Sequence, residues 1–198
     1  MRFIGITGGV GAGKSAILDY LSRKDGVRVM LADEIAHDLM EPGTDCFEKI
    51  RKQFQMEDIW TDDGKLDRLK LAQVIFADVE KRNILNGIVH PAVKKYVIAE
   101  AKKERMEGKR KLLVLEAALL IEEHYDEICD ELWYIYTSEE NRAERLKTSR
   151  GYSMEKIKNI FDSQLKEEDY RKYCQVVIDN NGSIEQTCRE IDQALQRE

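Results

Sequence analysis

A glycine-rich segment near the start of the chain has the residue types of a phosphate-binding loop. It reads Gly-x-x-x-x-Gly-Lys-Ser and consists of Gly8, Gly9, Val10, Gly11, Ala12, Gly13, Lys14 and Ser15. Glycines let backbone N–H groups approach phosphate oxygens, the lysine can reach β- and γ-phosphates, and the serine hydroxyl can bind Mg²⁺. A glycine-rich turn without a ligand is the weaker alternative, because all four fixed residues of the pattern are present.

The residues on either side of this loop predict the elements that would position it. Residues 2–7 are apolar and rich in β-branched side chains, which predicts a strand. Apolar residues at 17, 18 and 21 have helical spacing. The helix would open near Gly13 and direct its positive dipole end at the phosphates, so we include Ala16 among the nucleotide-binding residues.

Two acidic residues follow predicted strands. Asp33 comes after an alternating strand over 27–32, and Glu116 closes the apolar run 111–115. Open α/β sheets bind ligands at the carboxyl ends of their strands, so both acids are candidate site residues. Glu116 is expected near Mg²⁺. Asp33 could instead cap the helix predicted over 34–40. His37, four residues further on, lies on the same face of that helix as Asp33.

The remaining pattern predicts a doubly wound α/β fold with a parallel sheet of five strands. The further strands are predicted at 131–136 and 175–179. The further helices are predicted at 44–55, at 68–77, from 79 to about 107 with a break at His90–Pro91, at 138–150, from 154 to about 166, and at 183–197.

We expect one folded unit with two helical additions. The core would comprise residues 1–42, 109–137 and 171–198. Residues 43–108 are too long for a plain crossover and are interpreted as an acceptor-binding insertion. Residues 138–170 are rich in arginine and are interpreted as a lid over phosphates, although a solvated helix pair would have a similar composition.

Composition excludes several classes of protein. The 198 residues carry a net charge of −6 and no long basic run, which argues against a nucleic-acid partner. No apolar run approaches the ~20 residues that span a bilayer, so we expect no membrane segment. None of the four cysteines forms a Cys-x-x-Cys pair. With a strand predicted from residue 2 we expect no signal peptide, and we expect a cytoplasmic monomer or weak homo-oligomer.

Several segments together resemble the dephospho-coenzyme A kinase family. They are the phosphate-binding loop with Thr7, Ala32–Ala36, Asp63–Arg68 with His90–Pro91, and Leu119–Glu122 with Val177–Asn180. The resemblance spans essentially the whole chain. It implies transfer of the γ-phosphoryl group of ATP, with Mg²⁺, to the ribose 3′-hydroxyl of dephospho-coenzyme A as the small-molecule substrate.

The resemblance also implies roles for individual residues. Asp33 would accept the proton of the acceptor hydroxyl, and Lys14, Arg145 and Arg150 would neutralise the transferring group. The resemblance also places Arg68 and His90 on the acceptor side and Ser15 at Mg²⁺. We further expect His37, which shares a helix face with Asp33, and Leu119 to bind the acceptor, Asn180 to bind the nucleotide, and Glu116 to lie near Mg²⁺. For His90–Pro91 an alternative stays open, in which Pro91 is merely the first residue of a helix.

Three rival functions share parts of this pattern. A different small-molecule or nucleoside monophosphate kinase would have the same loop and lid, so only the acceptor side distinguishes it. A GTPase switch or regulatory ATPase is disfavoured because the guanine-binding segment Asn-Lys-x-Asp is absent from the sequence. A non-catalytic module is disfavoured because Lys14, Ser15 and Asp33 are all retained.

Overall fold

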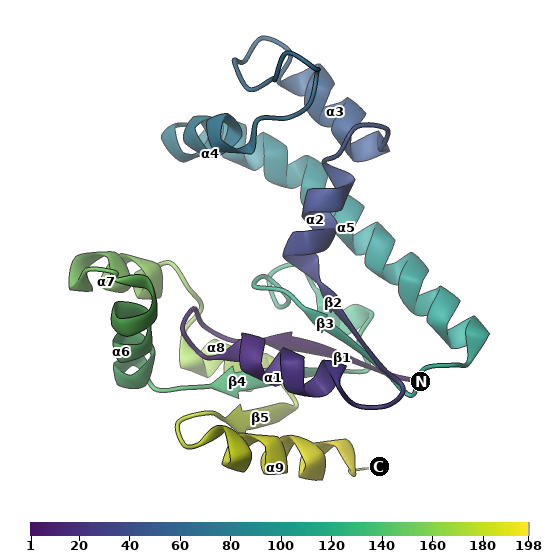
Figure 1. Cartoon of the computed structure of the whole chain (residues 1–198), viewed down its shortest axis with the longest axis vertical. Coiled ribbons are helices and arrows are strands. Elements are labelled where there is room, and N and C mark those ends of the chain that lie inside the picture. Colours follow the sequence, from purple (N-terminus) through teal and green to yellow (C-terminus); the bar gives the residue numbers. More distant parts are fainter. Residues whose placement is uncertain (198) are drawn as a thin grey trace. The chain divides into compact units, whose positions relative to one another are not determined.

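The computed structural model describes residues 1–197 (Figure 1). Within this range five strands form one sheet in the order β2-β3-β1-β4-β5. The strands are β1 (Arg2–Thr7), β2 (Val27–Leu31), β3 (Leu112–Glu116), β4 (Glu131–Tyr136) and β5 (Val176–Asp179). β1 pairs in parallel with β3 and β4, and β4 pairs in parallel with β5. The predicted doubly wound α/β fold is confirmed.

The register of the sheet brings four strand ends to one edge. Ile6 lies opposite Glu116, Thr7 lies opposite Tyr134, and Tyr136 lies opposite Asp179. Because the strands are parallel, the residues that follow β1, β3, β4 and β5 all leave the sheet at its carboxyl edge. This edge therefore collects the phosphate-binding loop, Glu116 and the residues after β4 and β5.

The chain divides into two compact units, and the first contains most of the sheet. It comprises residues 1–30 and 104–198, of which Glu198 lies outside the described residues. Its helices are α1 (Lys14–Ser22), α6 (Glu139–Arg150), α7 (Met154–Asp162), α8 (Glu167–Tyr173) and α9 (Ile184–Leu195), with a 3₁₀ turn at Tyr125–Glu127. α1 packs beside α9, and Figure 1 shows α1 in front of the sheet, α9 along β5 and α8 behind β4.

The single helix predicted from 154 to about 166 is wrong. α7 ends at Asp162 and a separate helix, α8, begins at Glu167. The reason is tertiary: the Gln164 side chain accepts a hydrogen bond from the Val10 N–H group, and the Tyr170 ring stacks on Tyr134 of β4 at 4.6 Å between centroids. Neither contact has a local sequence signal, so neither the end of α7 nor the presence of α8 was predicted.

The second unit, Leu31–Lys103, is helical. It contains α2 (Ala32–Leu39), α3 (Asp45–Gln53), α4 (Arg68–Ala77) and all but the last turn of α5 (Val79–Glu107). Its own core includes an edge-to-face contact between Phe47 and Trp60, with ring centroids 5.8 Å apart. The Asp67 carboxylate caps α4 by accepting hydrogen bonds from two backbone N–H groups of its first turn.

The predicted break at His90–Pro91 is wrong, and so is the alternative in which Pro91 starts a helix. α5 runs continuously through Pro91. Proline removes one helical hydrogen bond and crowds the carbonyl four residues earlier, which here belongs to Gly87. A stripe of buried side chains at four-residue spacing crosses the proline and holds the helix together: Leu85, Val89, Val93, Val97 and Ala101.

The boundary between β2 and α2 also differs from the prediction. The strand ends at Leu31, and Ala32, predicted as its last residue, is already helical. Leu31 occupies the N-cap position and makes no side-chain capping bond. Asp33 therefore lies inside the first turn of α2 and does not cap the helix.

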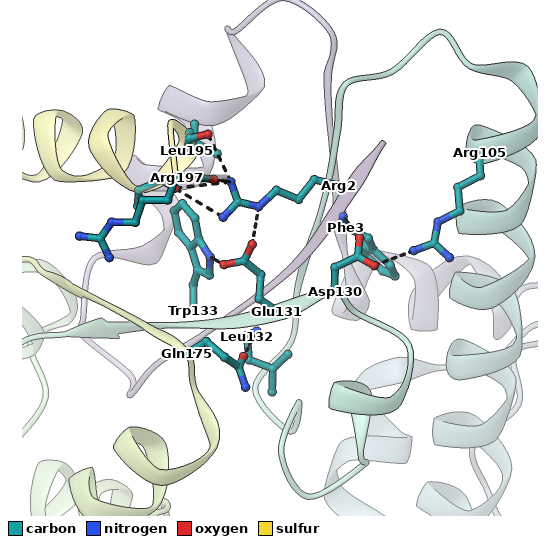
Figure 2. A network of polar contacts seen from close by, with 11 residues as sticks. Arg2, Phe3, Arg105, Asp130, Glu131, Leu132, Trp133, Gln175, Leu195 and Arg197 are labelled. Atoms are coloured by element: carbon teal, nitrogen blue, oxygen red, sulfur yellow. Dashed lines mark hydrogen bonds and ion pairs between the residues drawn. The ribbon is translucent and has the colours of Figure 1, made fainter.

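A polar network closes the amino-terminal edge of the sheet in the first unit (Figure 2). The Arg2 guanidinium pairs with the Glu131 carboxylate and donates a hydrogen bond to the Leu195 carbonyl at 3.2 Å. Trp133 Nε1 donates to the second oxygen of Glu131 at 2.9 Å. Arg2 thus links β1, β4 and the last turn of α9, where a cation also complements the helix dipole.

Candidate active site

The phosphate-binding loop connects β1 to α1 in a conformation that depends on glycine. Gly11 and Gly13 have φ angles of 86° and 85°, in the left-handed region that side chains disfavour. Gly13 is the N-cap residue of α1. The helix consequently begins at Lys14, and the N–H groups of its first residues are directed at the loop. This geometry forms a cradle for an anion.

The Lys14 ammonium group lies at the junction of the loop and β3. Its Nζ donates a hydrogen bond to the Gly8 carbonyl at 2.7 Å and lies 3.5 Å from a carboxylate oxygen of Glu116. The pairing of β1 with β3 accounts for this contact, because it places Glu116 opposite Ile6, two residues before the loop. The structure therefore brings together two residues that the sequence predicted independently.

The Ala12 carbonyl is held from outside the loop by three side chains. It accepts hydrogen bonds from Asn180 Nδ2 at 2.7 Å, Thr137 Oγ1 at 3.0 Å and Arg145 Nη1 at 3.2 Å. Asn180 is 5% exposed, and its own Oδ1 accepts from the Thr187 hydroxyl at 2.9 Å. The predicted residues Arg145 and Asn180 are thus placed on the loop, and Thr137 joins them.

Two further side chains contact the amino-terminal half of the loop, and sequence reasoning missed their role. Arg142 donates from Nε to the Val10 carbonyl at 3.0 Å and from Nη2 to Gln164 Oε1. Gln164 Oε1 also accepts from the Val10 N–H group at 3.3 Å. The only available signal was spacing: Arg142 precedes Arg145 by three residues, which places both on one face of a helix.

Other predicted residues of the first unit lie at its surface. Ser15 and Ala16 are exposed in the first turn of α1. Leu119 is 40% exposed in the turn that follows β3. Arg150 is exposed in the last turn of α6, where its guanidinium lies 5.9 Å from the centre of the Tyr152 ring. No contact between Arg150 and the loop occurs among residues 1–197, so its role stays a prediction.

The acceptor-side residues lie in the second unit. Asp33 and His37 are exposed on α2. Arg68 donates from Nη2 to the His37 carbonyl at 3.1 Å and pairs with Glu41 at 2.6 Å. His90 is half-buried in α5. The structure thus brings Arg68 and His37 together within this unit, as two residues predicted to serve the same substrate.

Comparison with known proteins decides the family. The model of the dephospho-CoA kinase family matches residues 2–186. The chain belongs to the dephospho-CoA kinase family. A curated dephospho-CoA kinase from Carboxydothermus hydrogenoformans is 36% identical over 100% of this chain and 94% of its own length.

Solved structures have the same fold as this chain. The crystal structure of TT1252 from Thermus thermophilus superposes with a TM-score of 0.79 at 28% identity, covering 98% of this chain and 96% of that one. A dephospho-CoA kinase from Campylobacter jejuni has the same fold, with a TM-score of 0.73 at 24% identity over 99% of this chain and 96% of that one. The predicted resemblance to the dephospho-CoA kinase family is confirmed.

The donor set of this family member is compatible with Mg²⁺ bound mainly by a nucleotide. Within residues 1–197 no group of three or more His, Cys, Asp or Glu side chains could hold a metal ion. The Ser15 hydroxyl and the Glu116 carboxylate carry oxygen atoms of the kind that Mg²⁺ prefers, and Mg²⁺ characteristically takes one or two protein oxygens together with phosphate oxygens and water. In the same part of the chain, no helix has the length and apolarity needed to cross a bilayer.

Proposed function

We propose that this protein transfers the γ-phosphoryl group of ATP to the ribose 3′-hydroxyl of dephospho-coenzyme A, giving coenzyme A and ADP. The observation that carries the proposal is the phosphate-binding loop, whose carbonyls and lysine are fixed by residues from three other strand ends, in a chain of the dephospho-CoA kinase family. Phosphoryl transfer requires little covalent chemistry from a protein, and depends on positioning and on neutralising charge.

Each site residue has a role in this proposal that follows from its place. The first-turn N–H groups of α1 and the Lys14 ammonium group bind the β- and γ-phosphates. Ser15 and Glu116 would hold Mg²⁺, which when bound neutralises phosphate charge. Arg145 and Asn180 fix the Ala12 end of the loop. Arg145, together with Arg150 if the lid closes, would also contribute positive charge to the nucleotide.

Asp33 is proposed to orient the acceptor hydroxyl and to accept its proton. Its carboxylate is exposed in the first turn of α2, immediately after the strand β2. A carboxylate is a weak base for a ribose hydroxyl, so orientation contributes as much as proton removal. Arg68, His37 and His90 would bind the acceptor, with Leu119 as an exposed apolar contact.

A coupled assay tests the proposal directly. Purified protein is incubated with ATP and Mg²⁺, ADP release is followed with and without dephospho-coenzyme A, and the product is identified by its mass. We expect ADP release to depend on dephospho-coenzyme A and the product to gain one phosphate. The same assay with nucleoside monophosphates, shikimate and gluconate as acceptors is the control. Faster turnover with any of these, or rapid hydrolysis without an acceptor, would refute the assignment.

A further inference from the structure

Arg142 is a buried cation held against the phosphate-binding loop. It is 8% exposed, and its Cζ atom lies 4.2 Å from the centre of the Phe161 ring. Its hydrogen-bond acceptors within residues 1–197 are neutral: the Val10 carbonyl at 3.0 Å and the side-chain oxygen of Gln164. Burial lowers the pKa of Arg142, but an arginine still keeps its proton at neutral pH. A charged group is therefore desolvated here to contact the backbone of the loop.

Gln164 completes the contact by holding the other polar group of the same residue. Its Oε1 atom accepts the Val10 N–H at 3.3 Å as well as a hydrogen bond from Arg142. The N–H and the C=O of Val10 are thus both occupied by side chains outside the loop. Neither group is available to face a phosphate, and Val10 is fixed in orientation by one residue of α6 and one that follows α7.

This orientation determines where the next N–H group points. The peptide bond is planar and trans, so the Gly11 N–H is directed opposite to the Val10 carbonyl. Holding that carbonyl from outside turns the Gly11 N–H away from Arg142. The Ala12 carbonyl is held in the same way by Arg145, three residues further along α6, which orients the Gly13 N–H. Alternate carbonyls of the loop are therefore held by successive arginines of one helix.

We propose that Arg142 and Gln164 act as a positioning pair, which keeps the phosphate-binding loop in its binding shape before the nucleotide arrives. The pair acts through backbone hydrogen bonds, so its contribution is to ATP affinity and not to the transfer step. This inference rests on the proposed function, because it assumes that the loop binds the phosphates of ATP. It assigns a role to two residues beyond the lysine, the serine and the loop itself.

Variants of the two residues test the pair. In Arg142→Met and in Gln164→Leu we expect the ATP dissociation constant, measured by calorimetry, to rise roughly tenfold, as expected for losing a hydrogen bond that involves a charged donor. The turnover number at saturating ATP and the KM for dephospho-coenzyme A should change less than about twofold. The loss of ATP-binding free energy in the double variant should be smaller than the sum of the losses in the two single variants, because the residues share one network. Lys147→Met, at an exposed position of α6, is the matched control.

Gln164→Glu separates positioning from direct charge. The glutamate keeps an oxygen acceptor for both donors but neutralises Arg142. Positioning through hydrogen bonds predicts an ATP dissociation constant within about threefold of the native value. A loss of ATP affinity as large as that of Arg142→Met would overturn the proposal, because it would mean that the charge of Arg142 acts on the phosphates directly.

Gly9→Ala probes the same contact without changing any residue of α6. A methyl group at Gly9 would overlap the Arg142 guanidinium and displace it from Val10. We expect an ATP affinity close to that of Arg142→Met, with a thermal unfolding curve of the whole protein, followed by circular dichroism, close to that of the native protein. Native ATP affinity in both Gly9→Ala and Arg142→Met would refute the pair while leaving the kinase assignment intact. If native protein instead phosphorylated another acceptor, the assignment would fail, and the ATP affinities would still test the pair.

Discussion

Replacing Gly13 by alanine should damage both the stability of the protein and its affinity for nucleotide. Gly13 has a φ angle of 85° at the N-cap of α1. An added Cβ would lie 2.5 Å from Asn180 Nδ2 and 3.1 Å from Arg145 Nη1. The substitution therefore combines an unfavourable backbone conformation with displacement of two groups that hold the Ala12 carbonyl.

The magnitude follows from these two contributions. A left-handed conformation costs an alanine about 1–2 kcal/mol. Displacing the Asn180 amide removes a hydrogen bond of 2.7 Å to the Ala12 carbonyl, which is worth about 1 kcal/mol, and the Arg145 bond to the same carbonyl is weakened. We expect the free energy of unfolding to fall by about 2–4 kcal/mol. ATP affinity should fall at least about 100-fold, because the first-turn N–H groups lose their alignment.

Gly108→Ala is a matched control for the backbone contribution. Gly108 has a φ angle of 65°, and a Cβ built there would meet no atom within 4 Å. The free energy of unfolding of this variant should fall by about 1–2 kcal/mol, and its ATP affinity should be native. Urea unfolding and calorimetric titration with ATP measure both quantities for the two proteins. Equal stability losses, with native ATP affinity in Gly13→Ala, would refute the claim that Asn180 and Arg145 crowd and fix the loop.

Three further predictions concern other parts of the protein. Asp33→Asn should lower kcat by about 100-fold or more while changing the ATP dissociation constant little, and equal losses in both would exclude Asp33 from the transfer step. Lys14→Ala should weaken ATP binding and turnover together, because its Nζ lies at the loop, and native values of both would contradict the proposed cradle. Partial burial would raise the pKa of Glu131, but the hydrogen bonds from Arg2 and Trp133 outweigh it and lower the pKa (Figure 2). The ionised Glu131 carboxylate therefore contributes to the stability of the fold. This contribution is complete above the unfolded-state pKa of about 4.3 and is lost as the pH falls through the lower folded-state pKa. Urea unfolding between pH 7 and pH 3 should show a shallower acid loss in Glu131→Gln, and an unchanged slope would refute the assignment.

The sequence alone was sufficient where the signal is local. Eight consecutive residues specify the phosphate-binding loop, because glycine conformations and a lysine–serine pair are properties of that segment itself. Alternating and continuous apolar runs located the five strands, and the order of the elements predicted the parallel sheet. The resemblance to the dephospho-coenzyme A kinase family rested on segments that can be recognised without coordinates.

Only the tertiary structure decided how the loop is held. The hydrogen bonds of Arg142, Thr137 and Gln164 to the loop join residues that lie more than 120 positions apart in the chain, and sequence periodicity carries no information about such pairs. The same reason explains the errors in the predicted elements. Pro91 predicts a break from local chemistry, but buried side chains on both sides of it keep α5 continuous. Local patterns specify the elements, whereas packing between distant segments determines where they end and which side chains reach the loop.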